Sequence, residues 1–93
     1  MTITEAAKTE LKRIRETRVP DNAKCLRLVT PPQWVGEGDF GIGIDDVRED
    51  DYVVEVGGVQ VLLVDWDLTV RLANAVFDFK QTPNGAGFTL DVY

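Results

Sequence analysis

The sequence predicts a single α+β domain that spans residues 1–93. Three patterns favour this class. An apolar stripe at helical spacing lies near the start of the chain. Two apolar runs flank the Gly57-Gly58 pair, which is typical of a β-hairpin. Two alternating runs, at residues 76–80 and 88–93, indicate a second hairpin. A chain of 93 residues buries one modest core, so we expect one domain.

The first predicted element is a helix over residues 4–17. Thr4 can act as its N-cap, and Ala7, Leu11 and Ile14 recur at the spacing of one apolar stripe. The pattern places the following charged residues on the exposed side: Lys8, Lys12, Arg15 and Glu16.

Residues 25–29 read as a short strand, with Leu26 and Leu28 on one face. A glycine-rich loop with Trp34 follows. Residues 40–44 then alternate large side chains with glycine, which indicates a flat or bulged edge strand whose bare face could admit close packing.

The acidic run at residues 45–51 lacks the Asp-x-Asp-x-Asp-Gly spacing of a calcium loop. We therefore expect it to be a solvated connector. A weak divalent-ion site is the alternative.

The stretch from Tyr52 to Asp65 is the strongest strand signal. A Gly-Gly loop suits a type I′ turn, because both central residues need positive φ. That turn predicts three pairs on one face of the hairpin: Val56 with Val59, Val54 with Val61, and Tyr52 with Leu63.

A short helix is expected over residues 65–72, with Asp65 or Asp67 as its cap and Leu68 and Leu72 on one face. We expect Trp66 to pack on the sheet. The closing hairpin should then point the following residues inward: Phe77, Phe79, Phe88, Leu90 and Val92.

Composition limits the function. A net charge of −6 argues against nucleic acid as a partner. Residues 1–30 carry seven Lys/Arg against four Asp/Glu, so head-to-tail association of a basic helix with an acidic body is an alternative to plain solubility. No apolar run is long enough to span a membrane, and one cysteine fits a reducing compartment, so we expect a cytoplasmic protein.

The sequence has no histidine and no serine. This excludes Ser-His-Asp and Cys-His nucleophilic sites and imidazole metal ligation from this chain alone. The catalytic options that remain are carboxylates, lysine, tyrosine, threonine and Cys25.

The order of elements resembles the HesB/IscA-like family, the A-type iron–sulfur cluster assembly scaffolds and carriers. The resemblance spans nearly the whole chain and implies a HesB-like domain with mainly antiparallel or mixed sheets in a sandwich-like arrangement. The matching stretches are Ile3-Thr4-Glu5-Ala6-Ala7, Leu26-Arg27-Leu28, residues 49–55, residues 58–65, Phe77-Asp78-Phe79 and Gly87-Phe88-Thr89-Leu90.

In that family the cluster depends on three cysteines, one in the loop after the first strand and two in a Cys-Gly-Cys tail. Soft iron–sulfur clusters need thiolate ligands. Here Val35 stands near the loop position, and the sequence ends at Tyr93 without the tail. Cys25 precedes the matching strand and is not at a ligand position of the family. The resemblance thus implies the fold without the cluster, and we expect no cofactor and no metal.

Three functions remain open. The first, which we expect, is a non-catalytic protein-binding or accessory role through the ligand loop, with Trp34, Val35, Glu37 and Asp39 as partner-binding residues. The second is an enzyme, or a small-ligand or metal-binding protein, that uses the Glu37 and Asp39 carboxylates. The third is a weak cluster carrier through an intermolecular Cys25 site. Self-association as a homodimer would suit the exposed hairpin edges.

Overall fold

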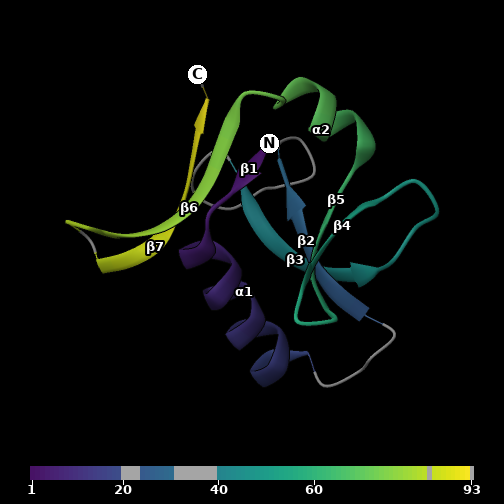
Figure 1. Cartoon of the computed structure of the whole chain (residues 1–93), viewed down its shortest axis with the longest axis horizontal. Helices are drawn as coiled ribbons and strands as arrows, with labels where there is room; N and C mark the ends of the chain where they lie inside the picture. Colours follow the sequence, from purple (N-terminus) through teal and green to yellow (C-terminus); the bar gives the residue numbers. More distant parts are fainter. Residues whose placement is uncertain (20–23, 31–39, 84, 93) are drawn as a thin grey trace.

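The computed structural model describes residues 1–19, 24–30, 40–83 and 85–92. Its elements follow the order of strand, helix, four strands, helix and two strands (Figure 1). Their bounds are β1 (Thr2–Ile3), α1 (Glu5–Arg18), β2 (Lys24–Val29), β3 (Gly41–Asp46), β4 (Tyr52–Val56), β5 (Val59–Val64), α2 (Trp66–Arg71), β6 (Ala75–Thr82) and β7 (Gly85–Val92).

The strands form two sheets. One has the order β3-β2-β5-β4, and the other has the order β1-β6-β7. Most neighbours are antiparallel, but β2 is parallel to β5 and β1 is parallel to β6. The predicted α+β class, with mixed sheets, an N-terminal helix and a short helix after the central hairpin, is therefore confirmed. The two-residue β1 was not predicted, because so short a segment carries no periodic signal.

Helix α1 packs against both sheets, through β5 in one and β6 in the other. In Figure 1 it lies at the base of the molecule between them. The Thr4 hydroxyl caps the helix by accepting from the Ala7 N–H at 3.2 Å, as predicted. Ala7 and Leu11 are fully buried, and they join a core drawn from both sheets.

The prediction that Arg15 is exposed is wrong. Its side chain is buried, and its guanidinium donates to the Val19 carbonyl just beyond the end of α1. A cation beside the last carbonyls of a helix is favourable, which accounts for its position.

The Gly57-Gly58 turn is confirmed, with φ values of 58° and 81°. The predicted register is correct next to the turn, where Val56 pairs with Val59. It is wrong beyond it, because the register shifts between Val54 and Glu55. The structure pairs Val54 with Leu62, Val53 with Leu63 and Tyr52 with Val64.

The shift has a physical cause. Residues 61–64 of β5 are all fully buried, since β5 lies between β2 and β4 with apolar neighbours on both faces. A run of four apolar residues has no alternation, so the sequence of that strand cannot specify the register.

Strand β3 is an edge strand, as predicted, and pairs only with β2. The space above Gly43 is open, so nothing among the described residues packs closely there. The closing hairpin pairs β6 with β7 over its whole length, and the Phe77 and Phe88 rings stack at 5.1 Å between centroids. Val92 was expected to point inward, but it is 63% exposed because it ends the edge strand β7.

Candidate functional site

The predicted partner-binding residues Trp34, Val35, Glu37 and Asp39 lie in the segment 31–39, outside the described residues. The two ends of that segment are described. Thr30 follows β2, and Phe40 precedes β3, which pairs antiparallel with β2. The segment therefore connects two neighbouring strands at the same end of the four-stranded sheet.

A groove of about 310 Å³ opens where this segment begins and ends. It brings together the end of β2, the start of β3, one face of α2 and the end of β7. Its lining is mostly apolar, with Arg71 as its charged member. The lining residues are Thr30, Phe40, Leu68, Arg71, Leu72, Leu90 and Val92.

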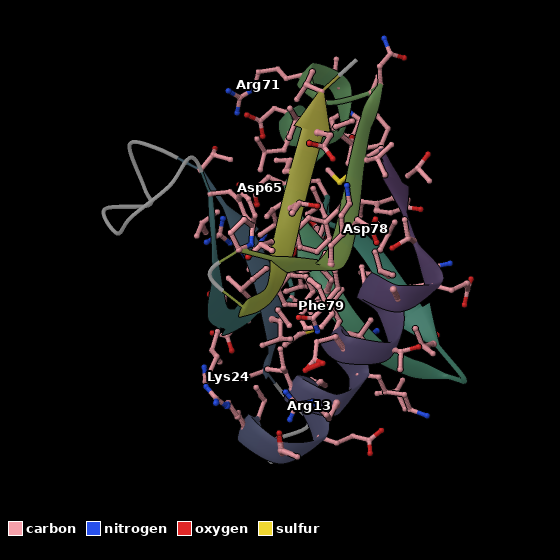
Figure 2. The ribbon with its side chains drawn as sticks, turned by 90° about the vertical axis from the view of Figure 1, so that its left-hand side faces the viewer. Arg13, Lys24, Asp65, Arg71, Asp78 and Phe79 are labelled. Carbon is pink, nitrogen blue, oxygen red and sulfur yellow. The ribbon has the colours of Figure 1, made fainter. Side chains whose placement is uncertain are left out.

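Cys25 lies far from this groove. It is the second residue of β2, five residues before Thr30, which at about 3.3 Å per residue is roughly 16 Å along the strand. Figure 2 shows Lys24, its neighbour, at the opposite end of the molecule from Arg71. The Cys25 side chain is buried, and its thiol donates to the Gln60 carbonyl at 3.4 Å. Burial raises the pKa of this thiol.

A charged centre occupies the middle of β2. The Arg27 side chain is 3% exposed, and its guanidinium binds Asp51 through two hydrogen bonds of 2.7 and 2.6 Å. Its Nε donates to Asp45 at 2.9 Å, and its remaining N–H groups donate to Asp65 and to the Asp46 carbonyl. All five donors of the guanidinium are therefore used.

This centre lowers the pKa of two of its carboxyls, Asp51 and Asp45. Hydrogen bonds from Arg27 hold the pKa of Asp51 below its ordinary value. The pKa of Asp45 is also lowered, first by the backbone N–H of Asp46 and then by the charge of Arg27. The partners in turn raise the pKa of Arg27.

The expectation that residues 45–51 form only a solvated connector is therefore wrong. The run contributes two carboxylates and one carbonyl to Arg27, and the Asp51 side chain is 1% exposed. A signal for this centre was present in the sequence. The arginine between Leu26 and Leu28 points to the opposite face of the strand. A strand covered on both faces buries that charge, and a buried charge requires partners.

Asp65 connects this centre to α2. It occupies the N-cap position of the helix, but its side chain makes no capping hydrogen bond, because the carboxylate binds Arg27 instead. The prediction that Trp66 packs on the sheet is wrong, since its side chain is 60% exposed. Within the described part of the chain, no group of three or more acidic or cysteine side chains is arranged to hold a metal ion.

None of the helices in the described ranges is both long and apolar enough to cross a membrane.

No family model matches the sequence. A relative from Bacillus subtilis, named uncharacterized protein SufA, is 33% identical over 92 residues, which cover 98% of this chain and 75% of the relative. A protein from Aquifex aeolicus, solved by solution NMR, is similar in structure, with a TM-score of 0.64 and 26% identity over 100% of this chain and 91% of its own.

Two further solved structures share the fold. SufA from Escherichia coli, described as involved in the biosynthesis of iron–sulfur clusters, has a TM-score of 0.58 and 20% identity, and covers 98% of this chain and 78% of its own. IscA, crystallised with a [2Fe-2S] cluster, has a TM-score of 0.58 and 16% identity, with 98% and 83% coverage.

Proposed function

The chain belongs to the HesB/IscA-like family of iron–sulfur cluster assembly proteins, and we propose that it acts there as a non-catalytic accessory protein that binds a protein partner in place of a cluster. The proposal has two parts, the loss of cluster binding and the gain or retention of a protein-binding surface. Each part rests on different residues and has its own test.

One observation carries the loss of cluster binding, which is the burial of Cys25. Cluster iron is ligated by deprotonated, accessible sulfur. The thiol of Cys25 is enclosed, has a raised pKa and already donates to a backbone carbonyl. A bridge between two copies through Cys25 would require β2 to open. The intermolecular cluster site is therefore the less favoured alternative.

The other side chains of this sequence do not replace the missing thiolates. There is one cysteine and no histidine in the 93 residues. The most buried carboxylate of the described part, Asp51, is fully engaged with Arg27 and with the Arg48 N–H. The loop that carries a ligand in the family has Val35 near that position.

The protein-binding part centres on the segment 31–39. A tryptophan beside two carboxylates is the composition expected of an interface anchor with a polar rim. The apolar groove is lined by Thr30 and Phe40, the described residues on either side of the segment, so a partner that binds the segment can also contact the groove. Glu37 and Asp39 supply the polar contacts. Self-association as a homodimer is the second form that this interface could take.

Anaerobic reconstitution tests the first part. The purified chain is incubated with ferrous iron, sulfide and a thiol reductant, desalted and scanned from 300 to about 600 nm. IscA treated in parallel is the positive control. We expect iron and sulfide to be removed from this chain by desalting, with no retained visible absorbance. A retained, stoichiometric chromophore would overturn the proposal.

Affinity capture from the native cell tests the second part. The chain is compared with a Trp34→Ala, Glu37→Ala variant and with a matched control, Tyr52→Ala, Glu55→Ala, which removes an exposed aromatic residue and a glutamate from β4. We expect one partner to be retained by the chain and by the control and lost by the variant. Light scattering of the purified chain reports whether that partner is a second copy.

A further inference from the structure

The geometry of α2 separates its apolar residues into two faces. Residues 66 and 70 lie one turn apart, as do residues 68 and 72, and positions two apart in a helix differ by about 200°. Leu68 is buried and Leu72 packs against the core, so this face holds the helix on the sheet. Trp66 and Val70 are on the opposite face.

That opposite face is directed to solvent. Trp66 is 60% exposed and Val70 is 62% exposed, so two large apolar side chains lie adjacent on the surface of a six-residue helix. The helix is held in place by Leu68 and by the Asp65–Arg27 ion pair, and the Thr69 hydroxyl donates to the Trp66 carbonyl at 2.6 Å. The Trp66 ring is therefore presented on a fixed backbone.

Carboxylates surround the indole ring. A surface pocket of about 270 Å³ is lined by Arg48, Asp50, Asp65, Trp66 and Asp67. Within residues 45–51 and 65–67 there are seven carboxylates. Four cations pair with them, namely Arg27, Arg48, Arg71 with Asp67, and Lys24 with Asp46, which leaves an excess of three negative charges. Arg48 is itself paired with Asp45. The surface beside Trp66 is consequently negative, with Asp50 and the exposed Asp67 next to the ring.

An indole face among carboxylates favours one kind of ligand. The ring attracts a cation through its quadrupole, and the carboxylates attract the same cation by charge. Guanidinium and ammonium groups on a flexible apolar stem satisfy both, because the stem covers the ring while the charged end reaches an acid. Val70, one turn away, adds an apolar contact for a neighbouring side chain.

The basic helix α1 of a second copy is a poor occupant. Three of its cations are already paired on the same helix, since Lys8 lies 3.6 Å from Glu5, Lys12 lies 3.8 Å from Glu16 and Arg13 binds Glu10. Arg18, the last residue of the helix, stands outside these pairs. Arg15 is buried. If α1 docked on the acidic surface, these ion pairs would be exchanged for similar ones with little gain in binding free energy. Charge complementarity therefore points to a different chain as the partner.

We propose that the Trp66/Val70 face of α2, with Asp50 and Asp67 beside it, is a docking site for a partner protein segment that carries lysine or arginine next to an apolar residue. This names the chemistry of a partner and so deepens the proposed protein-binding role. The site includes none of the residues 31–39. Its test uses neither iron nor sulfide, so its failure is distinguishable from a failure of the proposed function.

The probe is a capped twelve-residue peptide that alternates arginine and leucine. Two matched peptides replace its arginines with glutamate or its leucines with serine. Calorimetry on the full chain measures affinity. Two-dimensional ¹H–¹⁵N spectra locate the binding, because each of the two tryptophans gives its own indole N–H signal, assigned with Trp66→Phe. We expect the arginine-leucine peptide to bind, to shift the Trp66 indole signal and the α2 amides, and to weaken as salt is raised.

Variants distinguish this face from a diffuse acidic surface. Trp66→Ala should weaken peptide binding about tenfold, and Asp67→Asn about threefold. The controls Ile44→Ala and Glu16→Gln remove an exposed apolar residue from β3 and an exposed carboxylate from α1, and should change affinity less than about twofold.

Four outcomes would overturn the proposal. These are equal binding of the serine-substituted peptide, equal losses in the two controls, spectral shifts confined to elements other than α2, and a dimer in light scattering that Trp66→Ala abolishes. The spectra of Trp66→Ala without peptide report whether the variant is folded, so a loss of binding is attributable to the face.

Discussion

The carboxylates around Arg27 and those around Trp66 come from the same two stretches of chain, residues 45–51 and 65–67, yet they have opposite environments. The Asp51 side chain is 1% exposed and gives both oxygens to one guanidinium. The Asp67 side chain is 73% exposed and has a single ion pair with Arg71 at 3.2 Å. Asp65 serves both regions, since it binds Arg27 and lines the pocket beside Trp66.

The buried charges stabilise the fold, whereas the exposed charges are free to contact a partner. Arg27 and Asp51 hold β2, the acidic turn and the start of α2 together. All five donors of the guanidinium are used and the carboxylate is shielded from water, so neither group can bind a ligand. Exposed carboxylates beside an exposed indole contribute little to folding but are accessible to a partner. Mutations should therefore affect unfolding in one region and binding in the other.

The largest expected effect is that of Arg27→Met. Removing the guanidinium leaves Asp51 buried without its partner, which should lower the free energy of unfolding by about 3–5 kcal/mol. Urea denaturation measures the change. Arg48→Met is the matched control, because the Arg48 side chain is 59% exposed, and it should change stability by less than about 1 kcal/mol. Equal losses in the two variants would remove the distinction between the regions.

Asp51→Asn should have the next largest effect and should change the response to acid. The folded pKa of Asp51 lies below the unfolded value. Its stabilisation is therefore fully present above the unfolded aspartate pKa of about 3.9, and is lost as pH falls through the lower folded pKa. At neutral pH the substitution should destabilise the fold by about 2 kcal/mol.

The measurement for Asp51→Asn is urea denaturation between pH 7 and 2. The chain should lose stability steeply at the acid end, and the variant should have a shallower slope there. Asp67→Asn, the exposed control, should follow the profile of the unmodified chain. If the free energy of unfolding of the variant changed with pH as steeply as that of the unmodified chain, Asp51 would not be the source of the acid sensitivity.

Asp65→Ala should be intermediate because Asp65 belongs to both regions. The loss of its hydrogen bond to Arg27 should lower the free energy of unfolding by about 1–2 kcal/mol. Binding of the arginine-leucine peptide should weaken by about twofold, because the carboxylate is already engaged with Arg27. Denaturation and calorimetry on one sample measure both. If only the free energy of unfolding or only the peptide affinity changed, Asp65 would act in just one of the two regions.

The smallest expected effect on stability is that of Trp66→Ser. Because the ring is mostly exposed, the free energy of unfolding should stay within about 0.5 kcal/mol of its starting value. The control is Phe77→Ser, in the fully buried core, which should unfold or nearly unfold the chain. A loss above about 2 kcal/mol for Trp66→Ser would mean that the indole is part of the fold.

Local patterns predicted much of the fold. The N-cap at Thr4, the positive φ values at Gly57 and Gly58, and the alternation of Phe77 with Phe79 each depend on residues that are close in sequence. Such features are dictated by chain geometry within a few residues, so their positions were correct. The resemblance to the HesB/IscA-like family supplied the global arrangement, which the two sheets confirm.

What could not be predicted depends on residues distant in sequence. Whether Arg15 and Trp66 are buried is decided by the elements that meet them, and their own helical spacing leaves this open. The Arg27 centre joins partners that are 18, 24 and 38 residues away. The site residues Trp34, Val35, Glu37 and Asp39 lie outside the described ranges, so their partner-binding role stays a prediction.

Because the thiol of Cys25 is buried, its chemical labelling can measure local opening of the structure around β2. An alkylating reagent or an aromatic disulfide reacts with a thiolate, and this one is covered in the folded state. With a single cysteine in the sequence, the rate of labelling measures how often β2 separates from its neighbours, with no second thiol to confuse the signal. Comparing that rate at different reagent concentrations distinguishes the equilibrium of opening from its speed at this one position of β2.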